Sequence, residues 1–188
     1  MMKAYFEKVF KPVLDKIKDE ELKEKTIACW VMAAEEGGWK EEQIEQIPFT
    51  LLTDTKGLNL IEHTIAVTMG AAGLAQAMME HYRTMPLEIN MDWLYAGGLL
   101  HDVGKLLEFE YVDGEYRKSH FGKCARHPIS GAIVAAKVGL NNEIINMIAN
   151  HAKEGDGRPQ RIETVLIHQA DFATFNPLVM LQKGLLIE

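Results

Sequence analysis

Apolar residues recur at three- and four-residue spacing along most of this chain, which is the period of α-helices that bury one face. Near the start, the apolar positions are Phe6, Val9, Phe10, Val13, Leu14 and Ile17. Capping and helix-breaking residues bound similar stretches elsewhere. They predict two helices within 2–35 and further helices over 40–47, 60–82, 91–105, 128–139, 141–151 and 160–175. The predicted fold class is all-α, a helical bundle, and Pro177 is expected to end the last helix.

One segment breaks the helical pattern. Leu107, Phe109 and Tyr111 alternate with charged residues, as in a half-buried strand. Asp113-Gly114 follows, a pair well suited to a tight hairpin turn. We therefore expect a small β-hairpin near residues 106–119. It should project from a helical body, because a lone hairpin is barely stable.

Charge and cysteine usage limit the partners and the compartment. The formal net charge of −7 argues against tight binding to long duplex nucleic acid, although one local basic cluster would suffice for a nucleotide or a short single strand. Cys29 and Cys124 form no disulfide pattern, which suits a reducing compartment. Residues 1–18 are amphipathic and charged, and no apolar run approaches the roughly 18 residues that span a bilayer. We expect a cytoplasmic protein that does not contact a membrane.

Acidic and imidazole side chains lie on the apolar faces of several predicted helices. His63 shares a face with Leu60, Val67 and Leu74, which should point into the core. The same placement holds for His101, His151 and Asp171. A buried carboxylate is costly unless it is paired or bound to metal. Such groups on inward faces of different helices are best explained if they meet at one cation in the bundle core.

Two interpretations compete for each residue. A single histidine on an apolar stripe, such as His63 or His151 alone, is more often a core histidine with satisfied hydrogen bonds. The adjacent pair His101-Asp102 favours metal binding more strongly, because imidazole and carboxylate from neighbouring residues can converge on one ion. Only the joint pattern, with His127 included, is specific.

This joint pattern resembles the HD-domain superfamily of metal-dependent phosphohydrolases. The matching segments are Glu62-His63-Thr64, Gly98 to Lys105 (GLLHDVGK), His127 to Ala132 (HPISGA), Asn150-His151 and Gln169-Ala170-Asp171. The resemblance implies a metal-binding core over residues 60–175. Residues 1–50 would be an N-terminal helical extension, and 1–188 one HD-type domain, since this length suits a single core.

The superfamily's ligand pattern implies a metal role for six residues here. Its first His, its His-Asp pair and its last Asp hold one metal, which implies His63, His101, Asp102 and Asp171. Members with two further histidines bind a second metal, which implies His127 and His151, with Asp102 bridging. Imidazole and carboxylate ligands suit Fe, Mn, Co, Ni or Zn better than Ca. We expect one or two divalent transition-metal ions.

The resemblance also implies the chemistry, which is hydrolysis of a phosphoric ester by metal-activated water. Asp102 and Lys105 are the expected catalytic residues, with the Lys105 ammonium on the substrate phosphate; a surface lysine is the alternative interpretation. His168, one turn before Asp171, is either a residue that supports the metal ligands or a partly buried core histidine. Three flanking basic residues are expected to be solvated: Arg126, Lys153 and Arg158.

The substrate is expected to be a small, nucleotide-like phosphate ester. Residues 156–159 keep only part of the Gly-Tyr-Pro motif of cyclic-dinucleotide phosphodiesterases. The hairpin after the His-Asp pair is similar to HD-domain 3′–5′ exoribonucleases, but their nucleic-acid-binding domain does not fit within residues 1–50. We therefore expect a phosphomonoesterase or phosphodiesterase acting on a nucleotide or short oligonucleotide. The alternatives are a di-iron oxygenase of the same superfamily and a non-catalytic HD-type regulatory domain, which the complete ligand set disfavours.

Overall fold

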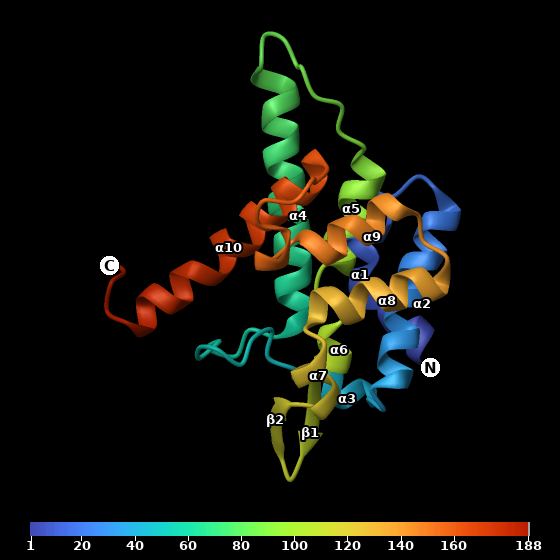
Figure 1. The fold of residues 1–188 in the computed structure, drawn as a ribbon, viewed down its shortest axis with the longest axis vertical. Coiled ribbons are helices and arrows are strands. Elements are labelled where there is room, and N and C mark those ends of the chain that lie inside the picture. The colour runs from blue at the N-terminus through green and yellow to red at the C-terminus, as the bar shows by residue number, and fades with distance from the viewer. Residues whose placement is uncertain (188) are drawn as a thin grey trace.

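The computed structural model describes residues 1–187, and these form a helical body with one small hairpin (Figure 1). The helices are α1 (Met2–Leu14), α2 (Glu20–Glu36), α3 (Glu41–Ile44), α4 (Leu60–His81), α5 (Met91–Leu100), α6 (Lys105–Glu108), α7 (His120–Cys124), α8 (His127–Val138), α9 (Asn142–Asn150), the 3-10 helix η1 (Lys153–Gly155) and α10 (Ile162–Gln182). The strands are β1 (Phe109–Val112) and β2 (Glu115–Lys118). The all-α prediction is confirmed. No helix within residues 1–187 is long and apolar enough to cross a membrane.

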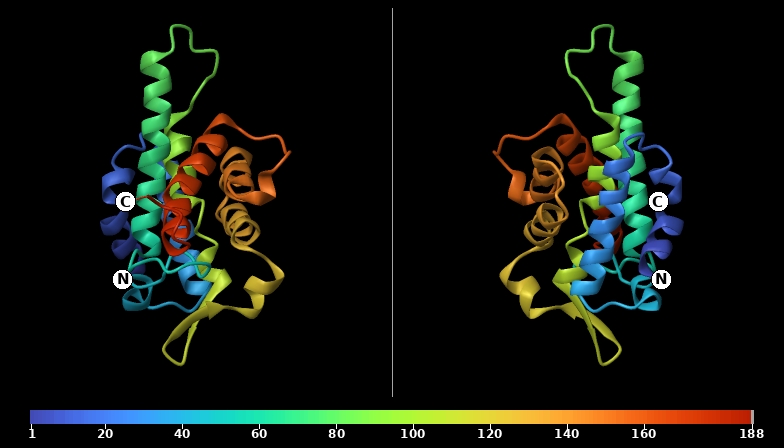
Figure 2. Two further views of the ribbon diagram at one scale, coloured as in Figure 1. Left: turned by 90° about the vertical axis from the view of Figure 1, so that its left-hand side faces the viewer. Right: turned by 90° about the vertical axis from the view of Figure 1, so that its right-hand side faces the viewer.

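The long helix α4 packs against both α5 and α10. Figure 2 shows α1 and α4 toward one side of the molecule and the pair α8 and α9 toward the other, with α5 and α10 between them. The first turn of α4 is set by a capping box, because Asn59 and Glu62 exchange side-chain-to-backbone hydrogen bonds of 2.9 and 3.0 Å. This local signal places His63 just inside the helix.

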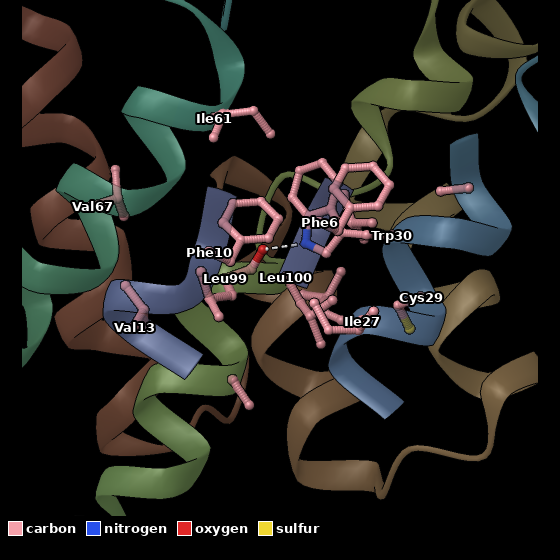
Figure 3. Packing of buried hydrophobic residues seen from close by; sticks show 14 of the residues in the cluster. Phe6, Phe10, Val13, Ile27, Cys29, Trp30, Ile61, Val67, Leu99 and Leu100 are labelled. Carbon is pink, nitrogen blue, oxygen red and sulfur yellow. Dashed lines mark hydrogen bonds between the residues drawn. The ribbon is translucent and has the colours of Figure 1, made fainter. Parts of the chain in front are cut away.

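An aromatic cluster joins the N-terminal helices to the centre of the fold (Figure 3). Phe6, Phe10 and Trp30 are fully buried, and the Trp30 ring centroid lies 5.3 and 4.9 Å from those of Phe6 and Phe10. The Trp30 indole N–H donates to the Leu99 carbonyl over 2.9 Å. The cluster therefore holds the C-terminal end of α5, just before the His101-Asp102 pair.

The hairpin is shorter than expected and is preceded by a helical turn. Its strands pair Phe109 with Lys118 and Val112 with Glu115, around Asp113 and Gly114 at positive φ of 55° and 87°. Residues 106–108 belong to α6 instead of β1, because the backbone N–H groups of Leu107 and Glu108 both donate to the Gly104 carbonyl, at 3.0 and 2.9 Å, and close a helical turn. The turn prediction was right, and the strand boundaries were too wide.

Two further predictions about helices were wrong. Pro177 lies inside α10 and does not end it. Its ring fixes φ near a helical value and removes only one N–H, and Phe175 and Leu178 on either side pack against the core. Leu74 is 44% exposed while Ala71, Ala72 and Ala75 beside it are buried, so at this level the alanine face of α4 is the one that packs against the core.

Candidate metal centre

The six predicted ligands come from five separate parts of the fold and meet at one place. His63 lies near the start of α4, His101 and Asp102 follow α5, His127 begins α8, His151 follows α9 and Asp171 lies in α10. Their ligand atoms form two groups, each with all atoms within 4.8 Å of one another: His63, His101 and Asp171, and Asp102, His127 and His151. Residues separated by more than 100 positions in sequence thus share one site.

Asp102 stands between the two groups. Its Oδ2 atom lies 3.4 Å from His63 Nε2 and 3.3 Å from His101 Nε2. Its Oδ1 atom lies 3.3 Å from His127 Nε2 and 3.7 Å from His151 Nε2. The two carboxylate oxygens therefore face different imidazole pairs, as a bridging ligand would require.

The tight turn after α5 is what allows Asp102 to lie there. Gly104 packs directly on the first turn of α8, and a Cβ atom at this position would lie 2.1 Å from the His127 carbonyl oxygen. Only glycine permits that approach. The approach brings the His101-Asp102 turn against His127, two segments 25 residues apart.

Hydrogen bonds orient three of the imidazole rings in the same sense. The Nδ1 atoms of His101 and His151 lie 2.7 and 2.8 Å from the carbonyl oxygens of Gly98 and Ile148. The Nδ1 atom of His127 lies 2.7 Å from Glu108 Oε2. Because a carbonyl or carboxylate oxygen can only accept, each Nδ1 carries a proton, and in the neutral ring the Nε2 lone pair is then free for a metal ion.

The donor set fits a divalent transition metal. The Nε2 atoms of His63, His101 and His151 are buried and have no hydrogen-bond partner within residues 1–187. Buried polar atoms are seldom left unpaired, and an ion held by this cluster would satisfy them. Imidazole nitrogens with two carboxylates suit such a metal, as expected for the HD domain, whose members bind divalent metals.

The ionisation states also suit ligation, because ligands must be deprotonated. Burial alone would raise the pKa of Asp171, but His63, whose Nε2 atom lies 3.1 Å from Oδ1, and the nearby His101 lower it to about 2. Burial also opposes ionisation of Asp102, yet Lys105 and His101 hold its pKa well below the usual value. Burial, with His101 and His127 nearby, lowers the pKa of His151 to about 3, so this imidazole is neutral.

Glu108 contacts the predicted ligand His127, and the sequence reasoning missed it. Its Oε2 atom accepts from both the backbone N–H and the Nδ1–H of His127, at 2.5 and 2.7 Å, while Lys118 Nζ lies 2.9 Å from Oε1. Burial would raise its pKa, but these contacts with His127 and Lys118 lower it to about 2. In sequence, Glu108 is one of several acids around the hairpin, and no spacing rule distinguishes it.

Lys105 lies deeper than a surface lysine. Its side-chain nitrogen is 2.5 Å from Asp102 Oδ2 and donates to the Phe49 carbonyl, and the residue is 8% exposed. It also lines the cavity described below. His168 donates from Nδ1 to the His151 carbonyl over 2.7 Å, so it supports the backbone of His151 and is not hydrogen-bonded to Asp171.

A cavity of about 620 Å³ opens onto this cluster. One part of its lining is apolar and comes from the 49–52 segment and α10; its members include Phe49, Phe172 and Phe175. Another part is basic and comes from the end of β2, the start of α8 and η1; its members are Lys118, Arg126 and Lys153. His127, Asp171 and Lys105 also line the cavity, so a bound molecule would contact the site directly.

Comparison with known proteins identifies related sequences over the same region. A model of the HD domain matches residues 60–172. Ribonuclease Y of Pseudothermotoga lettingae is 35% identical over 115 residues, which are 61% of this chain and 18% of that protein. Ribonuclease Y of Thermosipho melanesiensis is 30% identical over 135 residues, 72% of this chain and 22% of that protein.

A smaller relative is named for a different activity. Dihydroneopterin 2′,3′-cyclic phosphate phosphodiesterase of Methanocaldococcus jannaschii is 34% identical over 119 residues, 61% of this chain and 45% of that protein. The chain thus spans less than half the length of these curated relatives. No solved structure matches it.

Proposed function

We propose, from the premise that this chain belongs to the HD domain family, that it is a metal-dependent phosphodiesterase acting on a nucleotide or short oligonucleotide. The observation that carries the proposal is the convergence of four imidazole Nε2 atoms and two carboxylates around Asp102, beside a cavity with both basic and aromatic lining. Ribonuclease Y and the cyclic phosphate phosphodiesterase both cleave phosphodiesters by name. That shared bond type favours a diester over a monoester.

Ions held by the six residues would supply an activated water and neutralise charge on the phosphate. The protein's own part begins with ligand orientation, since the Nδ1–H groups of His101, His127 and His151 each have a fixed acceptor. Pre-oriented ligands need no rearrangement before the substrate arrives. Asp102 is proposed to bridge the two ligand groups.

The cavity supports a substrate with both phosphate and an aromatic ring. Lys118, Arg126 and Lys153 supply positive charge beside His127. The phenylalanines of the 49–52 segment and α10 supply flat apolar surface, and Phe49 and Phe175 are in edge-to-face contact at 6.4 Å. A cavity of this volume suits a ligand of nucleotide size. We propose that Lys105, which lines the same cavity, contacts the substrate phosphate.

Hydrolysis of bis(p-nitrophenyl) phosphate, 2′,3′-cyclic AMP and adenylyl-adenosine by protein reconstituted with Mn, Co, Fe, Ni or Zn tests the proposal. We expect turnover of at least one diester, loss of turnover with a chelator, and recovery with metal. Asp102→Asn should abolish it, while Cys29→Ala, in the distant core, should retain it. Absence of diester hydrolysis with every metal would refute the proposal, and oxygen consumption by the iron-loaded protein would then favour an oxygenase.

A further inference from the structure

Basic residues are concentrated in one segment of this acidic chain. Between residues 116 and 142 every Asp, Glu, Lys or Arg position is Lys or Arg, namely Arg117, Lys118, Lys123, Arg126 and Lys137. The chain as a whole carries a formal charge of −7. The segment includes the end of β2, helix α7 and the start of α8. Positive charge is therefore gathered immediately before His127.

Helix α7 connects the two basic residues that this segment contributes to the cavity. Lys118 precedes it and Arg126 follows it, and both line the cavity. Gly122 packs against α6, where a Cβ atom would lie 2.3 Å from the Glu108 carbonyl oxygen. The neighbouring residues on α7 remain accessible: Phe121 is 45% exposed, and Lys123 is exposed.

The same basic surface continues to η1. Arg126 pairs with Glu154 in η1 at 2.5 Å, which places Lys153 beside it. Neither Lys123 nor Lys153 forms an ion pair with any acid in the described part of the chain, residues 1–187. We call this surface the α7 rim and define it as Lys118, Phe121, Lys123, Arg126 and Lys153.

We propose that the α7 rim binds a single-stranded oligonucleotide that extends beyond the cavity, so that the substrate is longer than a dinucleotide. This inference rests on the proposed function, since it assumes that the scissile diester lies in the cavity. Ammonium and guanidinium groups at successive positions would meet successive phosphates. Phe121 would stack a base, as exposed aromatics do in sequence-tolerant single-strand binding.

The charges around the rim limit the length and kind of strand. Asp113 and Glu115 at the hairpin tip are exposed and acidic, so the strand would cross α7 and not follow the hairpin outward. Stacking on Phe121 requires a base outside a duplex. A few nucleotides of single strand therefore match the rim, whereas a long duplex does not.

The first test compares kcat/KM for adenylyl-adenosine and for an adenosine hexamer with the metal-loaded enzyme. We expect the hexamer to be favoured at least about tenfold. One stacked base contributes about 1–3 kcal/mol, which is at least about fivefold in affinity. Phe121→Ala should therefore reduce the value for the hexamer at least about fivefold more than the value for the dinucleotide.

The second test measures binding without turnover. A fluorescent 2′-O-methyl phosphorothioate adenosine hexamer, which resists cleavage, is titrated by anisotropy at several salt concentrations. Lys123→Ala should reduce the slope of log K against log salt by about 0.7, the value for one phosphate contact on a single strand. Matched controls are Lys137→Ala, which removes a cation paired with Glu36 at 2.8 Å, and Tyr82→Ala, an exposed aromatic at the far end of α4. Both controls should leave both measurements unchanged.

The outcomes separate the two proposals. Equal kcat/KM values for the dinucleotide and the hexamer would refute strand binding at the α7 rim. So would a loss of kcat/KM for the hexamer in Phe121→Ala that is no greater than in Tyr82→Ala. Neither result would contradict the proposed phosphodiesterase activity. If no diester is hydrolysed, the anisotropy series still tests strand binding at the α7 rim, because an unchanged salt slope in Lys123→Ala would refute that binding. Tighter binding of a duplex than of the hexamer would refute the single-strand assignment.

Discussion

Replacing Glu108 with alanine tests whether the region around the hairpin holds His127 in position. The Glu108 carboxylate accepts the His127 backbone N–H at 2.5 Å and its Nδ1–H at 2.7 Å, and it pairs with Lys118 at 2.9 Å. Glu108 and His127 are 6% and 8% exposed. Glu108→Ala therefore leaves two nearly buried donors of His127 without an acceptor.

The expected loss of stability in Glu108→Ala follows from these two unpaired donors. A buried donor left unpaired costs about 1–3 kcal/mol, and because Glu108 lines the cavity, water can partly replace it. We expect Glu108→Ala to lose about 2–3 kcal/mol in the free energy of unfolding. For a chain of this length each kcal/mol is about 2–4 °C in Tm, so the melting temperature should fall by roughly 5–10 °C.

Metal binding provides a readout that a purely structural role would not affect. Loss of the carboxylate also frees the His127 ring and its tautomer, and removing such an orienting partner typically weakens metal binding about 10–100-fold. Calorimetry of the metal-free and metal-loaded protein, with elemental analysis, measures both effects. The weakened site should be the one containing His127 and His151, with the His63 group unaffected.

The matched variants are Glu108→Gln and Glu110→Ala. Glutamine keeps one acceptor without charge and should lie between wild type and Glu108→Ala. Glu110 pairs with Arg117 in a more exposed setting, and such pairs contribute about 0–1 kcal/mol. A Glu108→Ala protein that melts within about 1 °C of wild type and binds both metals equally well would refute this role for Glu108.

The pH dependence of the free energy of unfolding also tests the contacts that Glu108 makes with His127 and Lys118. Because the pKa of Glu108 is lowered from 4.5 to about 2 by His127 and Lys118, despite burial, its contribution is fully present above pH 4.5 and is lost as the pH falls through about 2. The stability advantage of wild type over Glu108→Gln should therefore shrink across that window. An advantage that stays constant with pH would contradict the depressed pKa.

Three further predictions concern the metals and the substrate. A chelator should lower Tm by roughly 5–10 °C, because metal at a hundred times its Kd adds about 2.7 kcal/mol; an unchanged melting curve after verified metal removal would argue against the site. His127→Ala should reduce the metal content from about two ions to about one, whereas His63→Ala should weaken the other group; equal stoichiometry by elemental analysis would leave both as non-ligands. Lys105→Ala should raise KM more than it lowers metal content, and the reverse result would assign its ammonium to Asp102 alone.

Local sequence signals predicted much of the fold correctly. Asn141 caps α9, and Gly139 ends α8 at a positive φ of 78°, where the sequence predicted these helices to begin and end. The hairpin turn at Asp113-Gly114 was equally clear. These features depend on neighbours a few residues apart, so a single sequence contains them in full.

Predictions that needed distant contacts were less accurate. Pro177 did not end α10, since packing of Phe175 and Leu178 outweighed one lost hydrogen bond. The stripe containing Leu74 was predicted to be buried, but Leu74 is 44% exposed, while the neighbouring Ala71, Ala72 and Ala75 are the residues that other helices cover. Helical periodicity indicates which face is apolar, but it cannot indicate where the covering helices end.

By itself the sequence determined the helical class, the family and the set of side chains with metal-ligand chemistry, since His101-Asp102 and its four companions recur in a specific order. Only the tertiary structure decided that Asp102 faces both imidazole pairs, that Glu108 holds His127, and that Lys118, Arg126 and Lys153 line one cavity with four phenylalanines. The physical reason is that residue type and spacing set local geometry and burial preference. The neighbours of a side chain are instead fixed by the packing of segments such as Gly104 against His127, which the chain brings together from distant positions.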